Sequence, residues 1–145
     1  MKYKDILSAA VGTAGAFMAK LLGGWNGALT TLVIFMATDY ITGLLLAGVF
    51  KKSPKSENGA LQSYAGFKGI VRKGIILVIV LLSFRLDAVT GQNFIANGVI
   101  IAFITNEAIS ITENAALMGV PVPAPLTKAI DVLRSEPKAK SDNRE

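Results

Sequence analysis

The stretch that decides the fold is Ala28–Phe50, ALTTLVIFMATDYITGLLLAGVF, in which Asp39 is the single charged residue. A helix of these 23 residues is about 34 Å long, which exceeds the bilayer's hydrocarbon thickness of about 30 Å. The sequence therefore predicts a transmembrane helix over residues 28–50.

Two further apolar stretches follow this first one. Gly74–Phe84, GIILVIVLLSF, is uncharged but too short to span alone. It predicts a span over about 70–90 if the flanking basic side chains extend to the membrane surface. The third stretch, 94–112, is interrupted by Asn106 and Glu107. The expected fold is an all-α integral membrane protein with three transmembrane helices.

The composition excludes several classes of protein. The 145 residues allow a single domain, contain no His and no Cys, and have a mean hydropathy of +0.50. Without Cys there is no disulfide framework, thiolate nucleophile or usual zinc site, and without His the commonest general base is missing. We therefore expect no catalytic residues, no metal and no cofactor, and a membrane protein that is not an enzyme.

The segment 51–73 holds six of the 15 basic residues of the chain and one acid, Glu57. Its turn-forming residues predict a loop over 51–69. The positive-inside rule places this loop and the C-terminus in the cytoplasm, and 87–93, which lacks Lys and Arg, outside. The predicted topology anchors are Lys51, Lys52, Lys55, Lys68, Arg72 and Lys73.

The N-terminal block 6–22 leaves the number of spans open, because its one charge, Lys20, and its length suit more than one arrangement. It is either an apolar or amphipathic helix outside a three-span fold, which we favour, or a fourth span that puts the N-terminus inside. Small residues spaced by four let helices approach closely in lipid, although their abundance here also allows chance alignment. The predicted packing positions are Gly12, Gly15, Ala16, Ala19 and Gly43.

Asp39 lies near the middle of the first predicted span. A carboxylate there costs about 2.5–3.5 kcal/mol on insertion scales, so another group should compensate it. One reading is structural: a partner such as Lys20 or an amide, or a protonated acid. The functional reading is that Asp39 faces a water-filled lumen after assembly.

The third span carries a polar stripe. Asn106, Ser110 and Glu113 fall at positions i, i+4 and i+7, while Glu107, Ser110 and Asn114 fall at i, i+3 and i+7. Such a stripe is unfavourable against lipid, so it should face other helices, a lumen or the cytoplasmic headgroup layer. The sequence leaves pore lining and the headgroup layer as alternatives.

The C-terminal part is predicted to be a short amphipathic helix at the inner membrane surface, because Leu126, Ile130 and Leu133 recur at helical spacing. Residues 1–135 would form one membrane domain. The remaining 136–145 are polar and charged, which predicts a disordered tail.

Several stretches together resemble the small phage-lysis and toxin-secretion holins, a family that includes the clostridial toxin-cluster holin. Order and spacing hold from about residue 28 to 135. The matching residues are Asp39-Tyr40-Ile41-Thr42-Gly43, Lys52-Ser53, Gly66-Phe67-Lys68-Gly69-Ile70-Val71-Arg72-Lys73, Arg85-Leu86-Asp87, Asn106-Glu107-Ala108-Ile109-Ser110-Ile111-Thr112-Glu113-Asn114 and Gly119-Val120-Pro121-Val122-Pro123.

The resemblance implies a protein that oligomerises in the bacterial cytoplasmic membrane and opens a lesion. Its partners would be further copies of itself, membrane lipids, and a peptidoglycan hydrolase (endolysin) that is released without required direct contact; a toxin is the alternative cargo. No nucleic acid is expected. Under this hypothesis Asp39, Asn106 and Glu107 become lumen or inter-subunit groups.

Two other functions fit the same sequence. An antiholin inserts but only titrates a holin, so its expression leaves cells intact. A small ion-channel or transporter subunit would carry a defined small solute and release no folded protein. The chain has no internal repeat or pair of broken helices, which is weak support against a transporter.

Overall fold

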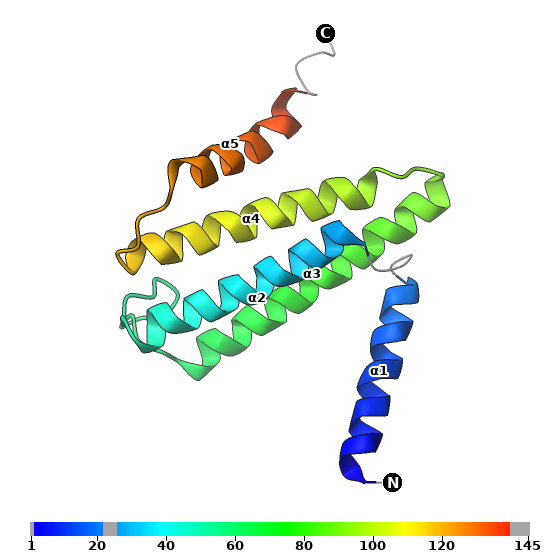
Figure 1. Ribbon diagram of the computed structural model, residues 1–145, viewed down its shortest axis with the longest axis horizontal. Helices are drawn as coiled ribbons and strands as arrows, with labels where there is room; N and C mark the ends of the chain where they lie inside the picture. The colour runs from blue at the N-terminus through cyan, green and yellow to red at the C-terminus, as the bar shows by residue number, and fades with distance from the viewer. Residues whose placement is uncertain (1, 22–25, 140–145) are drawn as a thin grey trace.

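The computed structural model describes residues 2–21 and 26–139, and within them every regular element is an α-helix. This confirms the all-helical prediction. Figure 1 shows their arrangement. The five helices are α1 (Tyr3–Leu21), α2 (Gly27–Gly48), α3 (Ser63–Thr90), α4 (Ile95–Leu117) and α5 (Ala124–Ala139).

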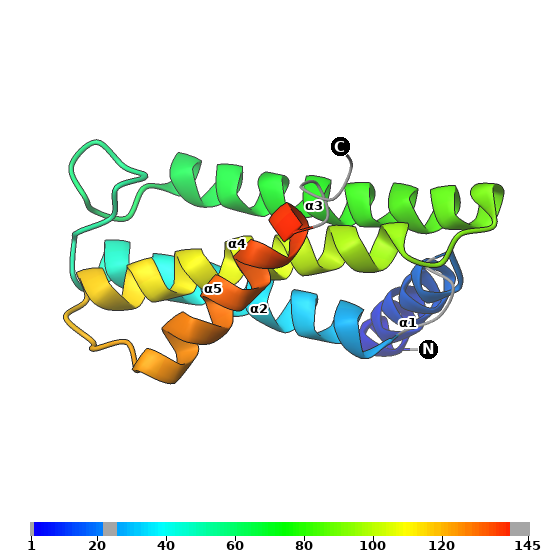
Figure 2. The ribbon, with the colours of Figure 1, turned by 90° about the horizontal axis from the view of Figure 1, so that it is seen from above.

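Helices α2, α3 and α4 lie side by side and form a three-helix bundle. Helix α4 packs against both α2 and α3, whereas α2 and α3 touch each other only sparingly (Figures 1 and 2). Helix α1 projects away from one end of the bundle, and α5 doubles back beside α4. The seam between α2 and α3 is thus the least closed side of the bundle.

Each bundle helix faces the other two with residues that alternate in steps of three and four. This heptad spacing keeps one stripe of a helix against its neighbours, as in coiled coils. We call these residues the inner stripes. They comprise Leu29, Leu32, Met36, Asp39, Gly43 and Leu46 in α2; Gly66, Gly69, Lys73, Ile76, Val80, Ser83 and Asp87 in α3; and Ala96, Ile100, Phe103, Glu107, Ser110 and Asn114 in α4.

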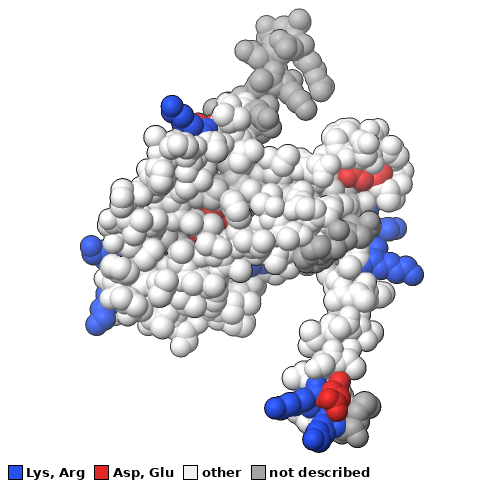
Figure 3. All heavy atoms as spheres, in the orientation of Figure 1, with Lys and Arg blue, Asp and Glu red and all other residues white. Residues whose placement is uncertain are grey.

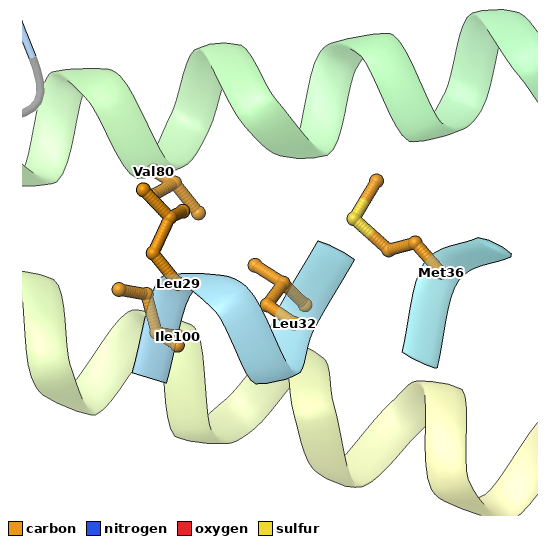
Figure 4. Close-up of a cluster of buried hydrophobic side chains, with 5 residues drawn as sticks. All are labelled: Leu29, Leu32, Met36, Val80 and Ile100. Carbon is orange, nitrogen blue, oxygen red and sulfur yellow. The ribbon is translucent and has the colours of Figure 1, made fainter. Parts of the chain in front are cut away.

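The apolar core occupies the half of the bundle near the start of α2. Figure 4 shows Leu29 of α2 beside Val80 of α3 and Ile100 of α4, with Leu32 and Met36 following along α2 in the same cluster. Leu32, Val80 and Ile100 have no solvent-exposed surface. This cluster closes one half of the bundle in the way that packed apolar side chains close a soluble protein core.

The turn between α3 and α4 is fixed by one side chain. Asp87 accepts hydrogen bonds from the backbone N–H groups of Ile95, at 3.0 Å, and Ala96, at 2.9 Å, at the start of α4. A carboxylate there satisfies donors that lack a helical partner and complements the helix dipole. Gly91 ends α3 with φ of 69°, a conformation that glycine adopts without strain.

The observed helix bounds differ from the predicted spans in instructive ways. Helix α2 matches the predicted first span closely, but α3 begins at Ser63 rather than near 70, and α4 continues to Leu117. In the described part of the chain, two helices, α2 and α4, are long and apolar enough to cross a membrane. Helix α3 falls outside this pair because charged residues flank its apolar run closely on both sides.

Helix α1 makes little contact with the rest of the chain. Its side chains from Tyr3 to Met18 are exposed, including apolar ones such as Val11 and Phe17. A Cβ atom added at Gly12 or Gly15 would have no neighbour within 4 Å. Gly12 and Gly15 therefore have no packing partner among the described residues, whereas Ala19 is half-buried.

Helix α5 is amphipathic, as its spacing predicts, and lies beside α4. Ile130 is buried, while Leu126 stays exposed. The helix runs to Ala139, beyond residue 135 where the sequence predicted a disordered tail to begin. Residues 140–145 of that predicted tail lie outside the described residues.

Candidate functional site

Three charged side chains, one from each bundle helix, meet inside the protein. The Nζ atom of Lys73 in α3 lies 2.8 Å from Oδ2 of Asp39 in α2 and 2.6 Å from Oε2 of Glu107 in α4. Asp39 and Glu107 are each 6% exposed. We call these three residues the ion network.

The inner stripes explain why these three residues meet. Asp39 continues the α2 stripe, Glu107 continues the α4 stripe, and Lys73 sits on the α3 stripe between Gly69 and Ile76. Because α3 runs antiparallel to both α2 and α4, the same level of the bundle receives one residue from each helix. The periodicity that buries Val80 also turns Lys73 inward.

Asn114 of α4 extends the ion network toward α2. Its Nδ2 atom donates to Thr42 Oγ1 at 3.0 Å and, more weakly, to Asp39 Oδ1 at 3.4 Å. Gly43 lies next to this amide, and a Cβ atom at that position would be in ordinary contact with Asn114 Nδ2 at 3.9 Å. Both oxygens of Asp39 are therefore satisfied within the chain.

The ion network contains two carboxylates and one ammonium group. With all three ionised its formal charge is −1, and no other described cation pairs with it. Breaking a buried pair by removing one partner costs about 3–5 kcal/mol, whereas replacing the whole set by apolar residues is often neutral. The ion network therefore holds the three helices in one arrangement and depends on Lys73 above all.

A cavity of about 660 Å³ reaches the ion network from the seam between α2 and α3. Asp39, Lys73 and Glu107 contribute to its wall, as do Asn106 and Ser110 of α4. The charged groups of the ion network are thus buried against one another, but on the side of the seam they border this cavity instead of packed side chains. Ile76 and Phe103 line the cavity and also pack against the apolar core, so the cavity ends where that core begins.

Near the loop end, Tyr40 bridges the seam between α2 and α3. Its hydroxyl lies 3.5 Å from the carbonyl oxygen of Gly66, at the limit of a hydrogen bond. A Cβ atom at Gly69 would lie 3.4 Å from the Tyr40 ring, and one at Gly66 would lie 3.5 Å from its hydroxyl. Tyr40 therefore packs directly against Gly66 and Gly69 where α2 and α3 otherwise make few contacts.

The structure separates the two polar sets of the third span. Glu107 and Asn114 are buried and Ser110 is half-buried, so the set at i, i+3 and i+7 faces inward. Asn106 and Glu113 are exposed. Of the inward-facing set, Glu107 belongs to the ion network and Asn114 hydrogen-bonds to Asp39.

The predicted basic anchors also separate into two groups. Lys51, Lys52, Lys55, Lys68 and Arg72 are exposed at or near the α2–α3 loop, whereas Lys73 points into the bundle. Figure 3 shows a bundle face that is nearly uncharged along its length, with basic side chains at the end that carries this loop. Lys20, considered above as a partner of Asp39, is exposed on α1, and Lys73 takes that place.

Sequence reasoning did not foresee the roles of Lys73, Thr42 and Asp87. For Lys73 a signal was present: Gly66, Gly69, Lys73 and Val80 share one heptad stripe, with small and apolar residues on both sides of the lysine. Thr42 carries no comparable signal, because its partner lies on another helix.

Comparison with known proteins places this geometry in a family. Residues 16–135 match the sequence profile of the bacteriophage holin family. An uncharacterised 14.9 kDa protein of Clostridium perfringens is 36% identical over 124 residues, covering 84% of this chain and 88% of the relative. An uncharacterised protein of Listeria monocytogenes is 36% identical over 132 residues, with 88% and 89% covered.

A third relative has a functional name. The probable holin of Bacillus phage phi105 is 30% identical over 115 residues, which cover 79% of each chain. No solved structure matches this sequence. The matched region contains the whole three-helix bundle and the ion network. The chain belongs to the bacteriophage holin family.

Proposed function

We propose that this protein is a holin: it accumulates in the bacterial cytoplasmic membrane, self-associates, and opens a lesion through which an endolysin reaches the cell wall. The lesion requires no covalent chemistry, so the protein acts without being an enzyme. Membership of the holin family and the similarity to the probable holin of phage phi105 support this role.

We propose that α2, α3 and α4 are the three spans, with the α2–α3 loop and the C-terminus in the cytoplasm. The antiparallel packing of the three helices supports this topology. If only α2 and α4 crossed the membrane, α3 could not pack beside them and Lys73 could not reach Asp39 and Glu107. The basic residues of the loop support its cytoplasmic side. Helix α1 then lies outside the bundle, and a fourth span through α1 is the alternative.

Single-cysteine labelling tests this topology, because the chain contains no cysteine. In cells expressing Gln92→Cys, a membrane-impermeant maleimide should label the protein from outside. Ser53→Cys should be labelled only after the membrane is opened. Lys4→Cys distinguishes three spans, with external labelling, from four. Protection of Gln92→Cys in intact cells would contradict the proposed topology.

The ion network is the single observation that carries the mechanism. Charged groups inside a membrane are costly and mark functional positions, and here three of them lie beside a cavity at the least closed seam of the bundle. We propose that crowding of the protein opens the α2–α3 seam. Asp39, Glu107 and Asn114 then face a shared aqueous lumen, while the apolar outer surface stays in lipid.

In assembled lesions the exposed Asn106 and Glu113 would lie between copies or at the lumen edge, together with Ser110. The small residues of α1, exposed in one chain, would supply contacts between copies. The placement of Asn106 and Glu113 follows from their exposure, because a polar side chain that faces no neighbour among the described residues needs one in the assembly.

The decisive test expresses the chain in a bacterium together with a cytoplasmic endolysin. A holin should arrest growth abruptly and release the endolysin and a large cytoplasmic reporter enzyme. An antiholin would leave growth unchanged, and a channel subunit would pass small ions but retain the reporter. Either of these results would overturn the proposal.

The mechanism has its own test in the triple variant Asp39→Leu, Lys73→Met and Glu107→Leu. Because the whole ion network becomes apolar, the protein should still fold and insert, yet it should fail to open a lesion. The matched control is Thr38→Leu, since Thr38 is exposed and its hydroxyl bonds only to the Ile34 carbonyl of its own helix. Lysis by the triple variant on the normal schedule would rule out the lumen role.

A further inference from the structure

The cavity at the α2–α3 seam changes character along its length. Ile75, Ile76 and Ile79 of α3 line its apolar end, with Ile75 and Ile79 partly open to the outside, whereas Lys68 and Arg72 of the same helix line the end that we call its mouth. A volume of about 660 Å³ lies in the usual range of ligand sites, about 300–1,000 Å³. It is therefore large enough for more than an ion, and it is amphiphilic.

Spacing along α3 explains this change of character. Lys68, Arg72, Ile75 and Ile79 recur at steps of four, three and four, so they share one face of the helix. The distance along the axis from Lys68 to Ile79 is about 16 Å, roughly half of a hydrocarbon core of about 30 Å. The stripe therefore passes from a cationic end to an apolar end over the depth of one membrane leaflet.

The cations at the mouth are available for a ligand. Asp39 and Glu107 are the acids of the cavity wall, and both are already paired with Lys73. Among the described residues, Lys55, Lys68 and Arg72 form no ion pair, and Lys68 lies 4.7 Å from the centre of the Tyr64 ring. The mouth therefore presents unneutralised positive charge above an apolar slot.

We propose that this cavity binds an anionic phospholipid. Lys68 and Arg72 pair with the phosphate, Lys55 adds charge from the loop, and one acyl chain lies along Ile75 and Ile79 between α3 and α2. Basic pockets between membrane helices are suited to such headgroups. The lipid occupies the least closed seam of the bundle, so it sits where the proposed opening of the lesion begins.

This site rests on the proposed crossing of the membrane by α3, but lesion formation is not required for it. Lipid binding is measured on purified protein and lysis in cells, so each proposal fails by its own readout. Labelling of the cysteine variants described above tests the crossing separately.

The experiment uses native mass spectrometry of the full chain in detergent with added phosphatidylglycerol. We expect one bound lipid per chain, and about twentyfold weaker binding by the double variant Lys68→Gln/Arg72→Gln, because each basic residue contributes to headgroup attraction. The matched control is Lys51→Gln/Lys52→Gln, which removes the same charge from loop residues outside the cavity. The control should bind as the parent protein does.

A second variant tests the apolar slot without changing charge. Ile79→Trp fills the apolar end of the cavity and should also weaken binding of phosphatidylglycerol. Glycerol phosphate, which lacks acyl chains, should neither bind nor compete. Far-UV circular dichroism and size-exclusion chromatography confirm that the variants fold. A result in which only Ile79→Trp unfolds still leaves the charge pair and its control to decide.

Several results would overturn the proposal. Equal binding of phosphatidylglycerol and zwitterionic phosphatidylethanolamine would mean that the mouth does not select charge. If Lys68→Gln/Arg72→Gln and Lys51→Gln/Lys52→Gln lost equal affinity for phosphatidylglycerol, the attraction would be a general effect of basic charge and not of the cavity. Rapid disulfide formation between two copies of Ile79→Cys in membranes would identify a second chain as the occupant.

Discussion

The two halves of the bundle are built from the same three helices but closed by different forces. Near the start of α2, Leu32, Val80 and Ile100 exclude all solvent. In the other half, Asp39 and Glu107 pair with Lys73, Asp39 also accepts a hydrogen bond from Asn114, and both acids border a cavity. The difference teaches that one half resists opening by packing, whereas the other is held by a few directional contacts.

The largest effect should come from removing the ammonium group. Lys73→Met leaves two buried carboxylates without a cation, which should lower the free energy of unfolding by about 3–5 kcal/mol. Unfolding by sodium dodecyl sulfate in mixed micelles, followed by far-UV circular dichroism, measures the loss. Lys68→Met, an exposed position on the same helix, is the control and should change stability little. Equal stability of the two variants would contradict the central role of Lys73.

Truncation in the apolar half should have a smaller effect. Leu32→Ala should cost about 2 kcal/mol, the low end for such changes, because lipid already removes the drive to leave water and mainly packing is lost. Ile34→Ala on the same helix is the control, since Ile34 is 56% exposed and faces away from the core. A cost for Leu32→Ala above that for Lys73→Met would reverse the comparison between the halves.

The turn that joins α3 and α4 should contribute less again. Asp87→Ala removes the acceptor for two backbone N–H groups of α4 and should cost about 1 kcal/mol. Asp87→Asn keeps an acceptor oxygen and should recover part of the loss. The same unfolding titration resolves the order, and identical behaviour of the alanine and asparagine variants would exclude a capping role.

The smallest effect on stability should lie in α1. Gly15→Leu should favour α1 itself by up to about 1 kcal/mol through helix propensity, but should change the unfolding free energy of the bundle by less than about 0.5 kcal/mol, because no described atom lies within 4 Å of a Cβ at that position. Cross-linking in membranes then reports whether the same variant reduces self-association. A large loss of stability in the isolated chain would mean that α1 packs on the bundle after all.

The sequence predicted where the helices lie better than it predicted which side chains each helix turns toward its neighbours. The uncharged run of α2 located that helix because length and hydropathy are local properties, and the all-helical fold followed from them. The start of α3 was missed because the turn-forming residues at 53–59 predicted a loop that was extended to 69, whereas Gly66 and Gly69 lie within α3 and face Tyr40. Local composition does not report a contact with a distant aromatic ring.

The sequence singled out Asp39 and Glu107 as costly charges, and the structure buries both, but the sequence did not indicate their partner Lys73. Lys73 stands 34 residues from each of them, and its neighbours Lys68 and Arg72 gave it the character of a membrane-surface anchor. Whether a basic residue points outward or inward depends on the register of three helices. That register is a property of the packed bundle, and only the heptad stripe through Gly69 and Val80 hints at it.

The chain order of the ion network has a consequence for biogenesis. During translation Asp39 is synthesised first, Lys73 second and Glu107 last. The ion network therefore begins as one negative charge, becomes a neutral pair, and is completed by the second carboxylate. Helix α2 has its cation only after α3 has been synthesised, and α4 arrives at a site already neutralised. If α2 and α3 cross the membrane as proposed, stable insertion of α2 is coupled to translation of α3, and we expect the translocon to retain α2 until α3 emerges.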